Sequence, residues 1–174
     1  MEEDTVPKDP VLEARVKRLE STLAAVATRV HLNGLGVLNS NIRQFNSQAR
    51  DPQDQLQALQ VAISDESKGL CYNSPSDFPG TLIEAISLRW DAKRLANLLR
   101  FYDVRVLKPG SSVFTSSQSS EGGEEAVQKY IDLDDEAQVG SHSKECFTYF
   151  VIYIGLKRKV VDNYLPSTER RQTD

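Results

Sequence analysis

Four side chains of the kinds that bind soft metals or act as nucleophiles are spread along the chain: His31, Cys71, His142 and Cys146. His142 and Cys146 are four residues apart and would share one face of a helix. A structural zinc site needs four such ligands together, usually built from local pairs. Because His31 and Cys71 belong to no local pair, we predict no metal centre and no cofactor.

The remaining signatures of catalysis are incomplete. The neighbours of Cys146 include Phe147 and Phe150, and apolar surroundings raise a thiol pKa, so Cys146 is predicted to be a packed core residue. The acidic segment 132–136 lacks the central glycine of a calcium loop, and Ser143 stands where the closing Glu should be. No P-loop and no nucleophile elbow occurs. We therefore predict that the chain is not an enzyme.

Lys157, Arg158 and Lys159 form the densest basic run and are candidate phosphate contacts. The simpler interpretation is a solvated end to an apolar segment. With 21 basic and 25 acidic residues the net charge is −4, so no overall field attracts nucleic acid or an anionic membrane. We therefore predict that nucleic-acid binding is not the main role, and a nucleic-acid-associated regulator using this local patch is an alternative function.

A heptad pattern dominates the N-terminal region and predicts a coiled coil. Its apolar positions are separated by steps of four and three residues. Val16, Leu23 and Val30 take the a positions, and Leu12, Leu19 and Val26 take the d positions. Arg15 at g and Glu20 at the following e can pair between parallel helices. These eight residues are the predicted oligomerisation surface.

Two features of the heptads favour different numbers of helices in the coiled coil. Val at a with Leu at d favours two strands. The string from Arg15 to Glu20 resembles the Arg-apolar-x-x-apolar-Glu pattern of parallel trimers, and Val26 departs from Leu at d. We favour a homotrimer over a dimer. The alternative is an intramolecular bundle, in which the same stripe packs on a later helix of the chain.

The rest of the chain predicts a mainly α fold in which a small helical core follows the coiled coil. The predicted regions are 1–9 disordered, 10–32 coiled-coil helix, 33–107 helical core, 108–126 flexible Ser/Glu-rich linker, 127–165 C-terminal segment and 166–174 disordered tail. The glycines at 34 and 36 predict a helix break. Further helices are expected near 52–64, 80–89 and 91–103, with Asp91 as a cap. We expect Trp90 to be buried with Leu95, Leu98 and Leu99.

The apolar run 146–156 suits a buried strand or a buried helix, and we favour a helix over 143–165. Such a helix would be apolar on more than one side. We therefore predict that Tyr149, Ile152 and Tyr153 bind a protein partner.

These features predict a non-catalytic oligomeric adaptor, or an assembly or regulatory subunit, that works through protein–protein interaction. A small enzyme with no recognisable site is a further alternative. The acidic start of the chain lacks the basic and apolar regions of a signal peptide, and the run 146–156 is short for a membrane span. We therefore expect an intracellular protein of the cytoplasm or nucleus, with no membrane span.

Overall fold

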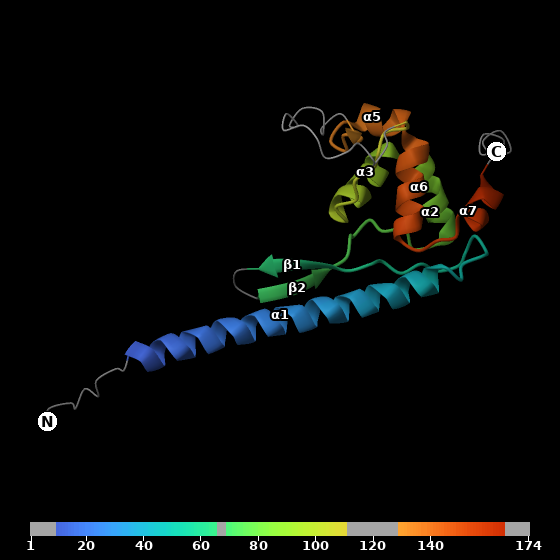
Figure 1. The fold of residues 1–174 in the computed structure, drawn as a ribbon. Helices are drawn as coiled ribbons and strands as arrows, with labels where there is room; N and C mark the ends of the chain where they lie inside the picture. The colour runs from blue at the N-terminus through green and yellow to red at the C-terminus, as the bar shows by residue number, and fades with distance from the viewer. Residues whose placement is uncertain (1–9, 66–68, 111–128, 166–174) are drawn as a thin grey trace, which may run out of the picture.

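A computed structural model describes residues 10–65, 69–110 and 129–165 (Figure 1). The fold is mainly α, as predicted, with one two-stranded antiparallel hairpin. A long N-terminal helix, α1 (Pro10–Asn46), runs along one side, and the shorter helices gather around its C-terminal end. The predicted disordered ends, 1–9 and 166–174, and positions 111–126 of the predicted linker lie outside the described residues.

The break predicted at Gly34 and Gly36 is wrong, because α1 continues through both residues to Asn46. Glycine weakens a helix without preventing it. Side chains further along, including Asn39, Ile42 and Asn46, hold this part of α1 against the rest of the protein. These tertiary contacts outweigh the local cost of the glycines.

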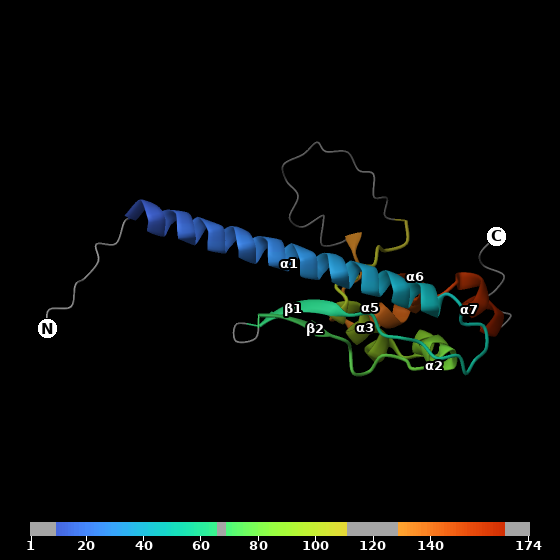
Figure 2. The same cartoon turned by 90° about the horizontal axis from the view of Figure 1, so that it is seen from below.

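The helix predicted over 52–64 is also wrong. Residues 56–60 have no regular structure, and they lead into β1 (Val61–Asp65), which pairs with β2 (Gly69–Asn73). Ile63 lies opposite Cys71 in this register. The three-residue spacing of Leu56 and Leu59 suggested a helix, but both side chains enter the core from an extended segment. The hairpin lies alongside the middle of α1 in both views (Figures 1 and 2).

The two helices predicted after the hairpin are confirmed. Thr81 caps α2 (Leu82–Ser87) by accepting from the Glu84 amide, and the Glu84 carboxylate in turn accepts from the Gly80 amide at 2.8 Å. A short 3-10 helix, η1 (Leu88–Trp90), follows. Asp91 then caps α3 (Ala92–Phe101), as predicted, by accepting from the Arg94 amide at 3.0 Å.

The run 146–156 is helical, which confirms the choice of helix over strand, but the single helix predicted over 143–165 is divided into α6 (Ser143–Tyr153) and α7 (Arg158–Tyr164). A further short helix, α5 (Glu136–Ser141), precedes them. The chain turns between α6 and α7 at Gly155, whose φ is +90°. A Cβ on Gly155 would lie 2.7 Å from the Cα of Arg43 on α1. Glycine therefore supplies both the backbone conformation and the close approach.

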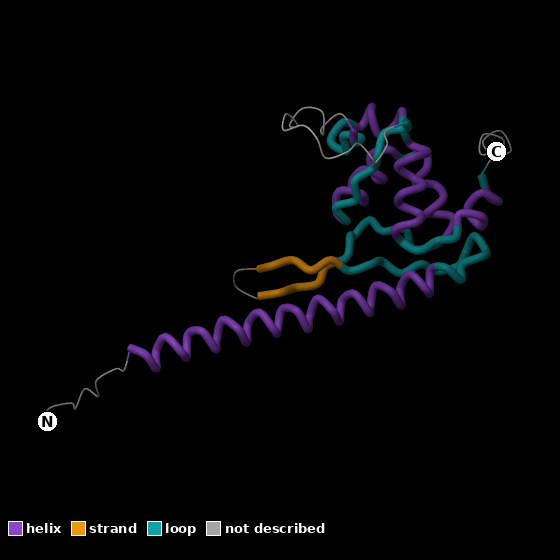
Figure 3. The backbone as a smooth tube through the Cα atoms, viewed as in Figure 1, coloured by secondary structure: helices purple, strands orange, loops and turns teal. Residues whose placement is uncertain are grey.

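The core lies among α2, α3, α5, α6 and α7, and Ile42 of α1 joins it at one edge. Figure 3 shows the irregular segments that connect α1 to the hairpin and the hairpin to the shorter helices. The fully buried side chains of the core include Leu95, Leu98 and Leu99. Trp90, however, is 60% exposed, so its predicted burial is wrong. Leu88 takes the inward position of η1, and at about three residues per turn of a 3-10 helix, a residue two places later points away from the core.

The C-terminal end of α1 is attached to the core by side-chain amides. Asn46 is fully buried; its Nδ2 donates to the carbonyls of Gln57 and Ile154, and its Oδ1 accepts from the Gln57 amide. Asn39, two turns earlier, pairs with both backbone groups of Gln60 in the same manner. In a sheet, a neighbouring strand would bond to the backbone amide and carbonyl groups of this segment. Here the asparagine side chains make those hydrogen bonds instead.

Replacing Asn46 with alanine should lower the free energy of unfolding by about 2 to 4 kcal/mol, because it orphans buried backbone groups of the extended segment and the α6–α7 turn. Chemical denaturation followed by circular dichroism measures this change. Asn41→Ala, at an exposed position of the same helix, is the control and should change stability by about 0.5 kcal/mol or less. Equal effects of the two substitutions would contradict the role assigned to Asn46.

The exposure of Trp90 predicts a native fluorescence maximum close to that of tryptophan in water, and strong quenching by acrylamide. Because Trp90 is the single tryptophan, the signal has one source. Trp90→Ala should change the free energy of unfolding by about 1 kcal/mol or less. A blue-shifted, poorly quenched native spectrum would contradict the exposed position.

Candidate functional site

The predicted heptad stripe forms an exposed surface on the N-terminal half of α1. Its six a and d side chains are between 46% exposed, at Val16, and 70% exposed, at Leu23. Arg15 and Glu20, beside the stripe, are exposed as well. In Figures 1 and 2 this half of α1 projects beyond the hairpin and away from the core. Among the described residues, nothing buries the stripe.

The unbroken helix carries the heptad register into its C-terminal half and separates two faces there. Counting on from Val30, Val37 falls at a and is 63% exposed. Leu35 and Ile42 fall at f, and Asn39 and Asn46 at c, on the side opposite the a/d stripe. The buried contacts of Ile42 and Asn46 and the hydrogen bonds of Asn39 are made from this c/f side, and Arg43 at g adds a hydrogen bond to the Tyr153 carbonyl. The attachment of the core therefore leaves the a/d stripe accessible.

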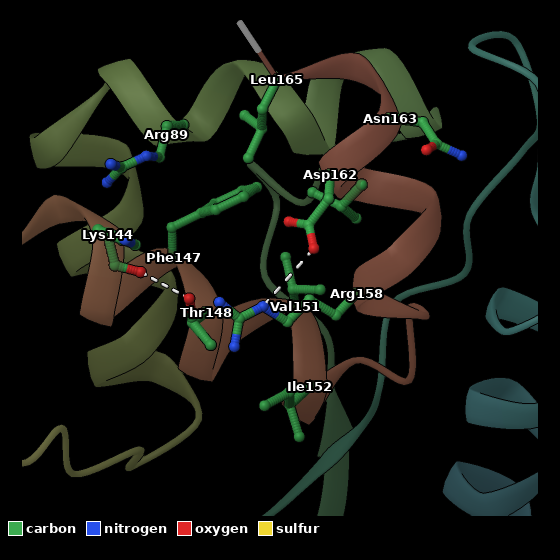
Figure 4. Close-up of a pocket in the computed structure, with 11 residues that line it drawn as sticks. Arg89, Lys144, Phe147, Thr148, Val151, Ile152, Arg158, Asp162, Asn163 and Leu165 are labelled. Carbon is green, nitrogen blue, oxygen red and sulfur yellow. Dashed lines mark hydrogen bonds and ion pairs between the residues drawn. The ribbon is translucent and has the colours of Figure 1, made fainter. Parts of the chain in front are cut away.

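A second feature is a pocket of about 160 Å³ between α6 and α7, close to η1 (Figure 4). α6 contributes one face to it, with spacings of three and four residues, and α7 contributes its first residue and the run 161–163. The pocket is lined by Lys144, Phe147, Thr148, Val151 and Ile152 of α6; Arg158, Val161, Asp162 and Asn163 of α7; Leu165; and Arg89 of η1.

The floor of the pocket is apolar and its rim carries charged side chains. Phe147, Val151 and Val161 are buried core residues whose outer surfaces form the floor. Arg89 donates from Nη1 to the Ser143 hydroxyl at 2.8 Å, so its guanidinium is held beside the start of α6. Arg158 forms an ion pair with Asp162 at 3.7 Å, with both side chains about half exposed.

Charged side chains of both signs line the pocket. Arg89, Lys144 and Arg158 are cations, and Asp162 is the one carboxylate among the described residues that line the pocket. The Thr148 hydroxyl donates to the Lys144 carbonyl at 2.8 Å and so faces the pocket with its donor already used.

The structure brings together parts of two sequence-predicted sites. Ile152, predicted to bind a partner, and Arg158, a predicted phosphate contact, line the same pocket, and Ile152 is 62% exposed. Tyr149 and Tyr153 are half-buried against the core. The Tyr153 ring lies 5.1 Å from that of Tyr102 and receives the Arg43 guanidinium at 5.2 Å. Lys157 and Lys159 are exposed at the start of α7 and do not line the pocket.

The four soft ligands noted in the sequence lie on separate elements. His31 is on α1, where its ring centroid lies 6.4 Å from that of Tyr72, and Cys71 is half-buried on β2. His142 precedes α6 and Cys146 is buried within it. Within residues 10–65, 69–110 and 129–165, no three His, Cys, Asp or Glu side chains are grouped to hold a metal ion.

Two groups of residues escaped the sequence analysis. Arg89 and Lys144 are isolated cations in sequence, so nothing marked them as neighbours of Arg158. Asn39, Arg43 and Asn46 looked like ordinary polar residues of a helix, although their spacing of four and three follows one side of it. None of the helices in the described part of the chain combines the length and apolar character needed to cross a bilayer.

The two cysteines should differ sharply in reactivity. Burial raises the pKa of the Cys146 thiol to about 11, with a smaller contribution from the Glu145 charge, and the reactive species is the thiolate. The native chain should therefore react with Ellman's reagent at Cys71 first, and at Cys146 only on unfolding. Cys71→Ser should remove the fast phase at pH 8, whereas Cys146→Ser should keep it. A fast phase that survives Cys71→Ser would contradict the burial of Cys146.

Comparison of the chain with protein-family models, with curated proteins and with solved structures gives no match. Family membership therefore contributes nothing to a functional assignment. The assignment rests on two surfaces of the chain itself: the a/d stripe of α1 and the pocket between α6 and α7.

Proposed function

We propose that the chain is a non-catalytic, homo-oligomeric adaptor or assembly subunit whose copies associate through the a/d stripe of α1. The observation that carries this proposal is the exposure of all six aliphatic a and d side chains on a helix that projects from the core. A continuous exposed apolar stripe is costly in water, and it marks an interaction surface. A second copy has the same stripe and is complementary to it.

The intramolecular alternative receives no support from the described residues, because no later helix covers the stripe. The core is attached to the side of α1 that faces away from the a/d stripe, and this favours association between chains. Asn39 and Asn46 attach the core to the c/f side of α1, so several α1 helices can meet along a/d with their cores on the outside. This placement supports a parallel bundle along the N-terminal half of α1, where all six a and d side chains are exposed.

A parallel homotrimer is the preferred assembly. Arg15 at g can pair with Glu20 at e of a neighbouring helix, which sets a parallel orientation. Val26 at a d position and the small side chains of Ala24 and Ala27 beside the stripe favour three helices over two. The unbroken helix places Val37 at the next a position after Val30, and Asn33 occupies the d position between them.

Replacing Leu19 and Leu23 with aspartate should convert the oligomer to monomer at micromolar concentration, because the assembled stripe would have to desolvate the new charges. Size-exclusion chromatography with light scattering measures the mass. Ser21→Asp with Thr28→Asp adds the same charge at f positions and should leave the mass unchanged. A wild-type chain that is monomeric at these concentrations, or a mass that both double variants alter equally, would refute assembly through the a/d stripe.

A further inference from the structure

We infer that a groove between α1 and the β-hairpin receives the Arg29 side chain of a second copy of this chain. The inference rests on the parallel assembly proposed above, because it names a contact that joins two copies beside the a/d stripe. Three observations carry it: the position of the groove next to the stripe, the glycine that opens the groove, and the residue that a parallel bundle places opposite that glycine.

The groove lies where the hairpin passes alongside α1 (Figures 1 and 2), and its volume is about 260 Å³. It is lined by five residues of α1 and two from the hairpin segment: Val30, His31, Gly34, Leu35, Leu38, Gln60 and Tyr72. Val30 also belongs to the a/d stripe and is 63% exposed, so the groove opens beside the surface proposed to bind another copy. Sites for small molecules range from about 300 to 1,000 Å³. This smaller groove suits one long side chain.

Gly34 keeps the way from the stripe to the groove open. It lies inside α1, where glycine is a poor helix former. A Cβ at Gly34 would meet no atom of the described residues within 4 Å, so packing within one chain does not require glycine there. Gly34 occupies the e position, which borders the a/d stripe, and it lines the groove. A longer side chain at position 34 would occupy this approach.

The heptad register places Arg29 of a neighbouring copy opposite Gly34. In a parallel bundle, a g residue faces the e residue five positions later on the next helix, as proposed for Arg15 and Glu20. Arg29 is at g, and the e residue five positions later is Gly34. Arg29 therefore meets no carboxylate at the e position that it faces, in contrast to Arg15. Its partner has to come from beyond the helix, and the hairpin lies there.

The groove offers contacts to both parts of an arginine side chain. A guanidinium packs well on the face of an aromatic ring, and Tyr72 is 38% exposed where it lines the groove. The chain already contains such a contact, since the Arg43 guanidinium lies 5.2 Å from the centre of the Tyr153 ring. The aliphatic side chains of the lining can cover the hydrocarbon stem of Arg29. The Arg29 head would then lie against Tyr72 of the neighbouring copy.

Cysteine cross-linking of the full chain tests this geometry. In a Cys71→Ser background, the Arg29→Cys, Tyr72→Cys variant is treated with a short bismaleimide and analysed on a denaturing gel. Cross-linked oligomers should form in higher yield than with either cysteine alone, because position 29 of each copy lies against position 72 of the next. Cross-links within one chain leave the mass unchanged. Cys146 is buried and should not react.

Thr22→Cys with Tyr72→Cys is the matched control for register. Thr22 is also an exposed g residue, but it lies one heptad earlier, about 10 Å along the helix axis. This pair should give a much lower yield of cross-linked oligomers than the pair at 29 and 72. Equal yields from the two pairs would overturn the inference, because the contact would then have no fixed register.

Substitutions that keep the a/d stripe intact test the contact itself. Arg29→Gln and Tyr72→Leu should each raise the dissociation constant of the assembly roughly twofold to thirtyfold per interface, the range for loss of an Arg–aromatic contact. The double variant should be no weaker than the weaker single variant, because both changes remove one contact. Arg18→Gln, at an exposed c position, controls for the lost charge and should have no effect. Sedimentation equilibrium measures these constants, and additive effects would overturn the inference.

Gly34→Leu provides an independent check. Leucine is a better helix former than glycine, so α1 should keep its helix content by circular dichroism. The assembly should nevertheless become weaker, because the new side chain occupies the approach of Arg29. An assembly that becomes stronger would contradict the role assigned to Gly34.

Light scattering of the same samples before cross-linking separates this inference from the proposed assembly. An oligomer that shows no cross-link between positions 29 and 72 would refute the contact in the groove and leave assembly through the a/d stripe intact. A monomeric wild-type chain would refute the assembly and the contact together.

Discussion

The buried side chain of Asn46 is the interaction on which the rest of the structure depends. Its amide joins three segments that are far apart in sequence: α1, the extended segment at Gln57 and the end of α6 at Ile154. A buried amide is stabilising only when its donors and acceptors are satisfied, and here both of its polar atoms are. Arg43, one turn earlier, adds a bond from Nε to the Tyr153 carbonyl at 2.8 Å. The helix therefore serves as a fixed support on which the core is built.

This attachment connects the two candidate surfaces. Residues 154–157 link α6 (Ser143–Tyr153) to α7 (Arg158–Tyr164), and side chains of both helices line the pocket. Arg43 and Asn46 hold that link through the carbonyls of Tyr153 and Ile154, and Gly155 allows α1 to approach it. The inner end of α1 therefore helps to set the geometry of the pocket, while the outer end presents the a/d stripe. One helix supports both surfaces from different ends and different faces.

The sequence predicted what local periodicity and capping control. The long first helix, the pair after residue 80 with Asp91 as a cap, and the helical C-terminal segment all have patterns that a short window contains. The predictions were wrong where contacts between residues far apart in the sequence determine the backbone conformation. The continuity of α1 through Gly34 depends on Asn39 and Asn46, and the extended segment near Leu59 depends on the same side chains. The pocket was missed because its cations meet only after three helices pack.

Assembly through α1 would multiply the contacts that each copy makes with a partner. A parallel bundle of α1 helices would carry one core per chain, and each core would present the same surface. A partner with repeated binding segments would then be held with an avidity about 10² to 10⁴ times greater than the affinity of a single copy, without any new contact. Assembly would thus turn weak binding by one copy into stable binding by the oligomer, as an adaptor requires.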